Sequence, residues 1–311
     1  MIPLRTNLDE QQTMTEVAFP TRGIETDGES ALIPLTPTTS ASVSSQLPET
    51  DTSRPIGHRA LHVACKHDPD LTVVRRLVEA YPEHLRIFDA HRDLPLHVAL
   101  LHQASINVVE FLVGSYPKSV ELPNGDDELP LNLAILCHAP IDILSLLMKA
   151  SPAALRQQDS LGHYPLHNMI AQGCYTVEEI QQVLQSYSPA MGLPGAEGQT
   201  PLHVAVLAGG APLDLVSSLL ATYEAAAKRF DDAGMLPLHA ALSQGASLPV
   251  VQLLVTTYPQ ALQLRDGQGL LPIEINATYG AHSSPAVAEF LRLANENLDE
   301  VSRGCDLLSP S

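Results

Sequence analysis

One short motif recurs through most of this 311-residue chain at nearly constant spacing. DLPLHVAL begins at residue 93, and the similar segments TPLHVAV and LPLHAAL begin at residues 200 and 236. A catalytic motif normally occurs once, whereas a motif with a fixed period is typical of stacked structural repeats. The repeat therefore favours an array of similar small units.

Three columns of residues keep a common period of 35 or 36 residues. The first column is mainly histidine, the second mainly tyrosine, and the third mainly aspartate or asparagine. Because the three columns stay in phase, chance similarity does not explain them. The columns are His62, His97, Asn132, His167, His203, His239 and Glu274; Tyr81, Tyr116, Ser151, Tyr187, Tyr223 and Tyr258; and Asp89, Asn124, Asp159, Gly195, Asp231 and Asp266.

Each unit is interpreted as a helix, a loop, a second helix and a turn. Pro95 suits the first turn of a helix, where its missing N–H would be unpaired anyway. The second helix carries apolar pairs spaced i, i+3, such as Val109 and Leu112, which lie on one face. Pro117 should stop that helix, because the residue before proline is pushed away from helical angles. One unit cannot bury its apolar face alone, whereas stacked copies can.

These units resemble ankyrin repeats. The motifs that carry the resemblance are LPLHVAL at 94–100, TPLHVAV at 200–206, LPLHAAL at 236–242 and VVQLL at 250–254. The resemblance covers residues 57–297 and implies an all-α ankyrin-repeat solenoid of about seven stacked helix-loop-helix units. The chain departs from the usual length of about 33 residues, and its LPLHxA and Tyr-Pro segments form a divergent type. The threonine usual before proline remains only at Thr200.

The resemblance divides the chain into three parts. Residues 1–56 are rich in Pro, Ser and Thr without helical or strand periodicity, which indicates a disordered N-terminal arm. Thr36, which precedes a proline, is a candidate for phosphorylation there, and its modification is left open. The array should occupy residues 57–297, and residues 298–311 should form a flexible C-terminal tail.

Composition excludes several classes of ligand. The formal net charge is -18, so neither nucleic acid, which is bound largely through Lys and Arg, nor a polybasic membrane contact is expected.

The 4 cysteines form no CxxC pair, which fits a reducing compartment. No apolar stretch has the length of a signal peptide or a membrane helix. We expect a soluble intracellular protein, in cytoplasm or nucleus, without a cofactor.

The histidine column does not predict a catalytic or metal site. Its members lie one unit apart and cannot converge, and the resemblance implies that they bond to backbone and tie neighbouring units together. A second cluster, formed by His62, Cys65 and His67, has metal-ligand residue types but no fourth partner at a recognised spacing. The structural column consists of His62, His97, His167, His203 and His239.

A partner-binding face is also implied by the resemblance, along the concave side of the array. Its acidic, histidine and apolar residues suit a protein or peptide with basic residues around an apolar anchor. Asp126, Asp127 and Glu128 are interpreted as a solvated turn tip rather than an acid–base pair. The matching positions are His91, Asp93, Val98, Leu101, His102, Asp126, Glu128, Leu133, Leu161, His163, Asn168, Glu197, Gln199, Val204, Asp232, Met235, Ser243 and Gln244.

The sequence thus favours a non-enzymatic scaffold or adaptor that binds a partner in a groove. A regulatory or inhibitory subunit of an enzyme or transcription factor is the alternative, since it needs only the same groove. An enzyme with a metal site at His62, Cys65 and His67 is the rival from a different class. The oligomeric state is left open.

Overall fold

The computed structural model describes residues 57–67, 70–186, 190, 192–208, 212–279 and 284–306. The chain divides into two units, Met1–Thr52 and Ser53–Ser311, and every described residue belongs to the second. The expected disordered arm and phosphorylation at Thr36 lie outside the described residues. Within them there are helices, turns and irregular segments but no strand, which confirms the all-α fold class.

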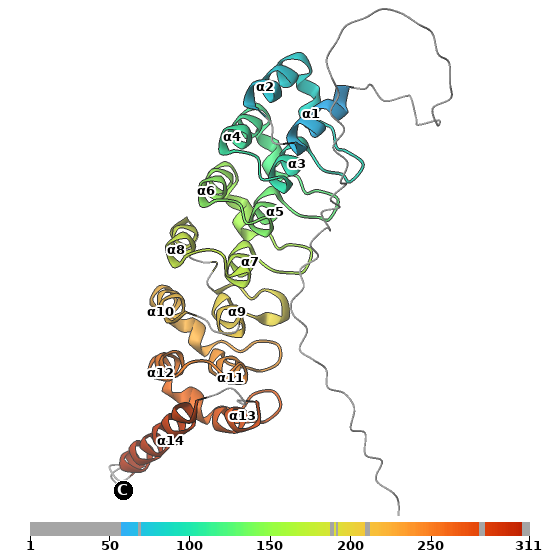
Figure 1. The fold of residues 1–311 in the computed structure, drawn as a ribbon. Coiled ribbons are helices and arrows are strands. Elements are labelled where there is room, and N and C mark those ends of the chain that lie inside the picture. Colours follow the sequence, from blue (N-terminus) through green and yellow to red (C-terminus); the bar gives the residue numbers. More distant parts are fainter. Residues whose placement is uncertain are drawn as a thin grey trace, which may run out of the picture. The chain divides into compact units, whose positions relative to one another are not determined.

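Seven helix pairs follow one another, and we number them as repeats 1 to 7 from the N-terminus. The first helices pack on each other in one row and the second helices in another (Figure 1). The first helices are α1 (Gly57–Lys66), α3 (Pro95–Leu101), α5 (Pro130–Leu136), α7 (Pro165–Gln172), α9 (Pro201–Leu207), α11 (Pro237–Ser243) and α13 (Pro272–Tyr279). The second helices are α2 (Leu71–Ala80), α4 (Ile106–Ser115), α6 (Ile141–Ala150), α8 (Val177–Ser186), α10 (Leu213–Thr222), α12 (Leu248–Thr257) and α14 (Pro285–Asp306).

Short 3-10 helices follow most of the second helices. The sequence predicted that Pro117 only stops a helix, but it also begins a 3-10 turn, because proline suits the first position of this helix too. Glu224 begins an equivalent turn without proline. The described 3-10 helices in this position are η1 (Pro82–Arg86), η2 (Pro117–Glu121), η3 (Pro152–Arg156), η6 (Glu224–Lys228) and η7 (Pro259–Gln263).

The core lies between the two rows and runs from repeat to repeat. Second-helix pairs such as Val109 with Leu112 and Val251 with Leu254 are at most 2% exposed, as their i, i+3 spacing predicted. Burial of each such side chain is worth on the order of 1.5–3 kcal/mol. The stack is therefore stabilised mainly by the contacts that neighbouring repeats make with each other.

Five-residue turns, which we call fingers, lead into the first helices of repeats 2 to 7. Asp159 shows how a finger is held, since its Oδ1 accepts hydrogen bonds from the backbone N–H groups of Leu161 and His163 at 2.9 and 2.7 Å. Gly195 replaces the Asp or Asn in repeat 5, where an added Cβ would lie 3.1 Å from the His167 ring. The fingers are residues 89–93, 124–128, 159–163, 195–199, 231–235 and 266–270.

The last helix, α14, differs from the other second helices by its length of 22 residues. Val287 and Leu291 are fully buried, and Leu298 packs against the core from a more exposed position. The helix runs to Asp306, beyond the boundary at residue 297 that the sequence analysis set, because apolar residues continue at helical spacing. None of the helices in the described residues has both the length and the apolar character needed to cross a bilayer.

Candidate interaction surface

Histidines of the first helices bond to backbone carbonyls near the next finger, and we call this set the histidine ladder. Three of them bond to the last residue of that finger, whereas His97 and His239 bond to the residue that directly follows η2 or η7. Nε2 of His203 donates a hydrogen bond to the backbone carbonyl of Met235 at 3.1 Å. The rings lie a whole repeat apart and do not converge on one site. The bonded pairs are His62 with Asp93, His97 with Leu122, His167 with Gln199, His203 with Met235, and His239 with Leu264.

The other ring nitrogen caps the helix on which the histidine lies. Nδ1 of His97 accepts a hydrogen bond from the backbone N–H of Leu94 at 2.9 Å, and His239 accepts equivalently from Leu236 at 3.0 Å. This bond satisfies an N–H group that has no partner inside the helix. The bond forms with leucine before proline as it does with Thr200, because its donor is a backbone N–H group. A threonine side chain adds a second bond, since Oγ1 of Thr200 accepts from the N–H of His203 at 3.5 Å.

Burial keeps the ladder rings neutral. His97 and His167 are fully buried, and loss of hydration lowers the pKa of each from 6.5 to about 4, although the bonded carbonyls oppose this. Burial also lowers the pKa values of His203 and His239. A neutral ring that accepts at Nδ1 and donates at Nε2 has no nitrogen left for a metal or a substrate.

The ladder is interrupted between repeats 3 and 4. Asn132 takes the histidine position in α5, is 1% exposed, and has no hydrogen-bond partner at either side-chain polar atom. His167 in repeat 4 keeps its forward bond, but its Nδ1 has no partner. Glu274 in the last repeat retains the cap, since its Oε2 accepts from the N–H of Leu271 at 2.7 Å. Among the residues of the histidine column, only Asn132 in repeat 3 lacks both the bond toward the next repeat and the bond that caps its own helix.

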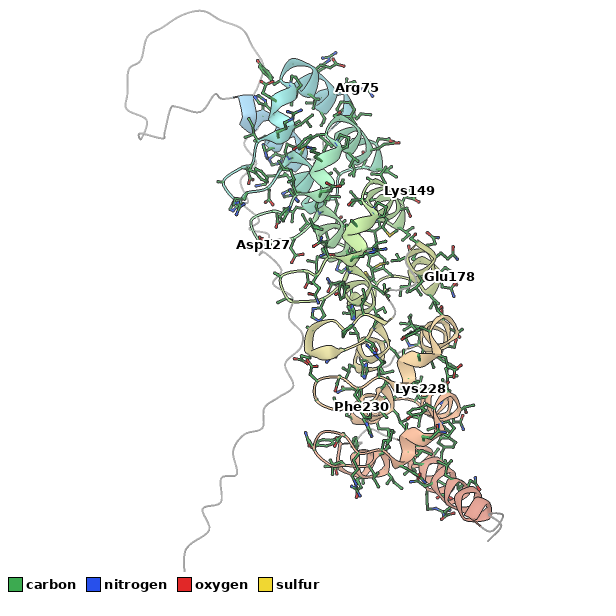
Figure 2. The ribbon with its side chains drawn as sticks, turned by 180° about the vertical axis from the view of Figure 1, so that it is seen from behind. Arg75, Asp127, Lys149, Glu178, Lys228 and Phe230 are labelled. Carbon is green, nitrogen blue, oxygen red and sulfur yellow. The ribbon has the colours of Figure 1, made fainter. Side chains whose placement is uncertain are left out.

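The fingers contact one another and form a continuous row, the finger surface. The N–H of Asp232 donates to the carbonyl of Glu197 at 2.9 Å, and the N–H of Gly267 donates to Ala233 at 3.1 Å. Between repeats 3 and 4, the hydroxyl of Ser160 donates to Oε1 of Glu128 at 3.0 Å. Figure 2 shows Asp127 on the finger side, and Lys149 and Glu178 on the side of the second helices.

The structure separates the sequence-predicted binding residues by their exposure. His91, His102, Asp126, Leu161, Glu197 and Asp232 are exposed. Leu101, His163, Gln199, Met235, Ser243 and Gln244 are partly exposed. Asp93, Val98, Glu128, Leu133, Asn168 and Val204 are buried, because the adjoining finger or helix covers them. Only the first two groups present side chains to a partner in this conformation, and their role in binding stays a prediction.

The three residues of the rival metal site do not form one. Cys65 is fully buried in the core, where loss of hydration raises the pKa of its thiol to about 12. His62 bonds to the carbonyl of Asp93 instead, while His67 is exposed. The described residues contain no group of three His, Cys, Asp or Glu side chains that could hold a metal ion.

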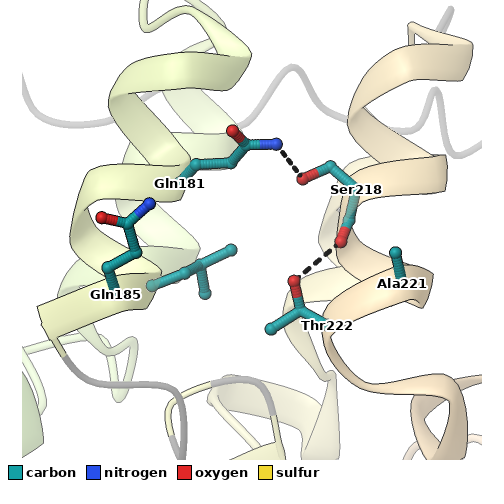
Figure 3. Close-up of a pocket in the computed structure, with 6 residues that line it drawn as sticks. Gln181, Gln185, Ser218, Ala221 and Thr222 are labelled. Atoms are coloured by element: carbon teal, nitrogen blue, oxygen red, sulfur yellow. Dashed lines mark hydrogen bonds between the residues drawn. The ribbon is translucent and has the colours of Figure 1, made fainter.

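A shallow cleft opens between α8 and α10, in the row of second helices (Figure 3). Gln181 crosses it and donates a hydrogen bond from Nε2 to Oγ of Ser218 at 2.9 Å. No acidic, basic or histidine side chain lines it, so it offers no group for acid–base chemistry near neutral pH. The lining residues are Gln181, Leu184, Gln185, Ser218, Ala221 and Thr222.

Two features of the surface were not anticipated from the sequence. Phe230, just before the repeat 6 finger, is 49% exposed although it is a large apolar residue. On the second-helix side, the guanidinium of Arg86 lies 5.4 Å from the ring centroid of Tyr116, and Lys228 lies 5.7 Å from that of Tyr258. The spacing from each cation to the next tyrosine in the column is the signal that could have revealed these contacts.

Comparison with known proteins identifies the type of repeat. Residues 166–266 match the family model of ankyrin repeats in three copies. The crystal structure of the ankyrin repeat domain of Bcl-3, a member of the IkappaB protein family, has a TM-score of 0.62 and 24% identity. That alignment covers 75% of this chain and 97% of the Bcl-3 domain. The crystal structure of the human ASB11 ankyrin repeat domain has a TM-score of 0.55 and 20% identity, and its alignment covers 78% of this chain and 98% of the ASB11 domain.

A search of curated proteins gives no significant match to the chain. The family match covers repeats 4 to 6, where the histidine column is unbroken, and the two structural likenesses extend over most of the array. Such repeats are generic protein–protein interaction modules, typically without enzymatic activity. Residues 166–266 are thus ankyrin repeats by family match, and the helix pairs and structural likenesses show that the array has the ankyrin-repeat fold.

Proposed function

We propose that the protein is a non-enzymatic scaffold or adaptor that binds a partner protein along the finger surface and the adjoining first helices. The observation that carries the proposal is the row of fingers, which hydrogen bonds join between repeats 3 and 4 and from repeat 5 to repeat 7. A surface that is already ordered loses little conformational freedom on binding, which favours affinity. The alternative of a regulatory subunit uses the same surface, and no separate observation favours it.

Charge on this surface favours a basic partner. Asp126, Asp127, Glu197 and Asp232 are exposed on the fingers of repeats 3, 5 and 6, within a chain whose formal net charge is -18. Complementary charge speeds the encounter of two proteins and is screened by salt. The partner should therefore carry Lys or Arg around an apolar anchor, and its association rate should fall as the salt concentration rises.

Affinity capture from the native cell tests this proposal, with charge reversal of the finger surface as the comparison. Asp126→Lys combined with Asp232→Lys should abolish capture of the partner while the far-UV circular dichroism stays helical. The matched control reverses two acids on other elements, Glu178→Lys on α8 and Glu224→Lys on η6, and should leave capture intact. Equal capture by both double variants would refute binding through the finger surface.

A further inference from the structure

A thiol and an imidazole meet on the surface where repeats 3 and 4 join, and we call them the thiol–imidazole pair. Nδ1 of His138, in the loop between α5 and α6, lies 3.0 Å from Sγ of Cys174, in the loop between α7 and α8. Both side chains are exposed. The adjoining Tyr175 donates from its hydroxyl to the carbonyls of Ile135 and Ala139 at 3.3 and 3.4 Å, which holds the Cys174 loop against repeat 3.

Cys174 differs from the other described cysteines by its exposure. Cys65 is fully buried and Cys137 is half-buried, and loss of hydration raises the pKa values of their thiols to about 12 and about 11. Partial burial and the nearby Glu179 also raise the pKa of Cys174. Its thiol is therefore protonated near neutral pH, and a base beside it must take the proton when the sulfur attacks.

His138 is placed to act as that base. The distance of 3.0 Å fits a hydrogen bond from the thiol to an unprotonated Nδ1. The φ of His138 is 56°, in the left-handed region that favours glycine, and the equivalent Gly173 and Gly245 have φ of 63° and 66°. The loop therefore forms in repeats 4 and 6 without any side chain at this position.

A cavity opens beside His138, between the helix-joining loops of repeats 2 and 3, and gives a small reactant room next to the imidazole. Gln103, Ser105 and Asp142 also line it, and its lining residues include no Lys or Arg. Because Asp142 lies at the cavity and Glu179 lies near Cys174, the local charge disfavours an anionic reactant. A neutral or cationic reactant suits the pair.

We propose that Cys174 is a site of thiol–disulfide exchange with a small disulfide that carries no net negative charge. Sγ attacks one sulfur of the disulfide while its proton passes to Nδ1 of His138, and the S–S bond of the reactant breaks. The leaving thiolate takes that proton, so the products are a mixed disulfide at Cys174 and one free thiol. The adduct removes the bond between Cys174 and His138, which is one of the links between repeats 3 and 4. The proposal does not depend on the partner protein.

The test treats the full-length protein with cystamine, a small cationic disulfide, and follows the mass of each cysteine-containing peptide over time. We expect Cys174 to form a mixed disulfide before Cys65 and Cys137, and an excess of cysteamine to remove it. The dianion 3,3′-dithiodipropionate should react several-fold more slowly at Cys174, with a difference that narrows as salt is added. Absence of reaction at Cys174, earlier reaction at Cys65 or Cys137, or equal rates with the two disulfides would overturn the proposal.

Variants at one loop position test the part of His138. His138→Gly should slow the reaction of Cys174 by at least about tenfold, since a positioned base typically contributes a hundredfold or more, and imidazole added to the solution should restore part of the rate. Gln103→Gly, at the equivalent position of repeat 2, should leave the rate unchanged. Both variants should retain the thermal midpoint, because glycine is natural there in repeats 4 and 6. An unchanged rate in His138→Gly, or a loss that imidazole does not restore, would show that His138 is not the base.

Discussion

In repeats 5 and 6, His203 and His239 each use one ring nitrogen near the start of their own helix. The other nitrogen bonds to a carbonyl at the end of the next finger for His203, and to Leu264 after η7 for His239. In repeat 3, Asn132 has the same place and makes neither bond, and in repeat 4 His167 makes only the second. The comparison shows that repeats with the same backbone can be joined by different side chains, since Ser160 and Tyr175 bond across the junction that lacks the ladder bond.

Acid should produce the largest effect, by weakening the ladder at four of its histidines. Because burial lowers the folded-state pKa values of His97, His167, His203 and His239 below 6.5, the unfolded chain binds protons first as the pH falls. Their contribution is complete above pH 6.5 and is lost progressively toward pH 4. For His97 and His167, a folded pKa of about 4 corresponds to about 3 kcal/mol each.

Urea unfolding between pH 7 and pH 5, with hydrogen exchange of α5 and α9, measures this loss. Protection of the α9 backbone amides against exchange should fall toward that of the α5 amides. The reason is that α9 carries His203, which binds a proton in this range, whereas α5 carries Asn132, which does not titrate. A free energy of unfolding that stays constant over this range would contradict the neutral ladder.

Truncation of one ladder ring should have the next largest effect. His203→Ala removes a forward bond and a helix-cap contact and leaves a cavity, so we expect a loss of about 3 kcal/mol. Asn132→Ala removes a side chain without hydrogen bonds and should change stability by less than about 1 kcal/mol. Urea denaturation of both variants checks the difference. Equal losses would mean that the ladder bonds do not distinguish the two regions.

Repair of the interruption should stabilise the array by a smaller amount. Asn132→His supplies a ring that can cap α5 and reach the next finger, and we expect a gain of about 1–2 kcal/mol. Asn132→Leu is the control, since it removes the unpaired atoms without adding a bond and should gain less. The thermal midpoints of both variants provide the measurement. A histidine variant no more stable than the leucine variant would show that the ring finds no partner there.

The smallest effect concerns the second-helix side, where repeat 3 again differs. Arg86 lies over the ring of Tyr116, whereas the equivalent residues one repeat further on are Glu121, at the end of η2, and Ser151. Arg86→Gln should cost about 0.5–1 kcal/mol through loss of the cation–π contact. Glu121→Gln should change stability by less, as measured by the same thermal midpoints. A larger loss from Glu121→Gln would argue against this explanation.

Periodicity was sufficient to predict most of the fold. The columns, the prolines and the apolar pairs report on backbone geometry and burial, which each repeat encodes locally. The 3-10 helices were missed because Pro117 was interpreted only as a stop. The extent of α14 was also missed, because a tail without the repeat motif was taken for a flexible segment.

The candidate surface was less predictable from sequence. The family pattern predicts that Glu128 and Asn168 lie near a partner-binding face, but their burial depends on how closely the next finger approaches. Asn132 was visible as an exception in the histidine column. Its lack of partners became evident only from the positions of the surrounding atoms, which belong to other repeats.

The bonds between repeats join only neighbours, and this has a mechanical consequence. A pulling force along the array passes through every junction in series. The junction that follows Asn132 lacks a ladder bond but has others, from Ser160 to Glu128 and from the Tyr175 hydroxyl to the carbonyls of Ile135 and Ala139. Resistance to extension is therefore set junction by junction, and different side chains supply it along the array.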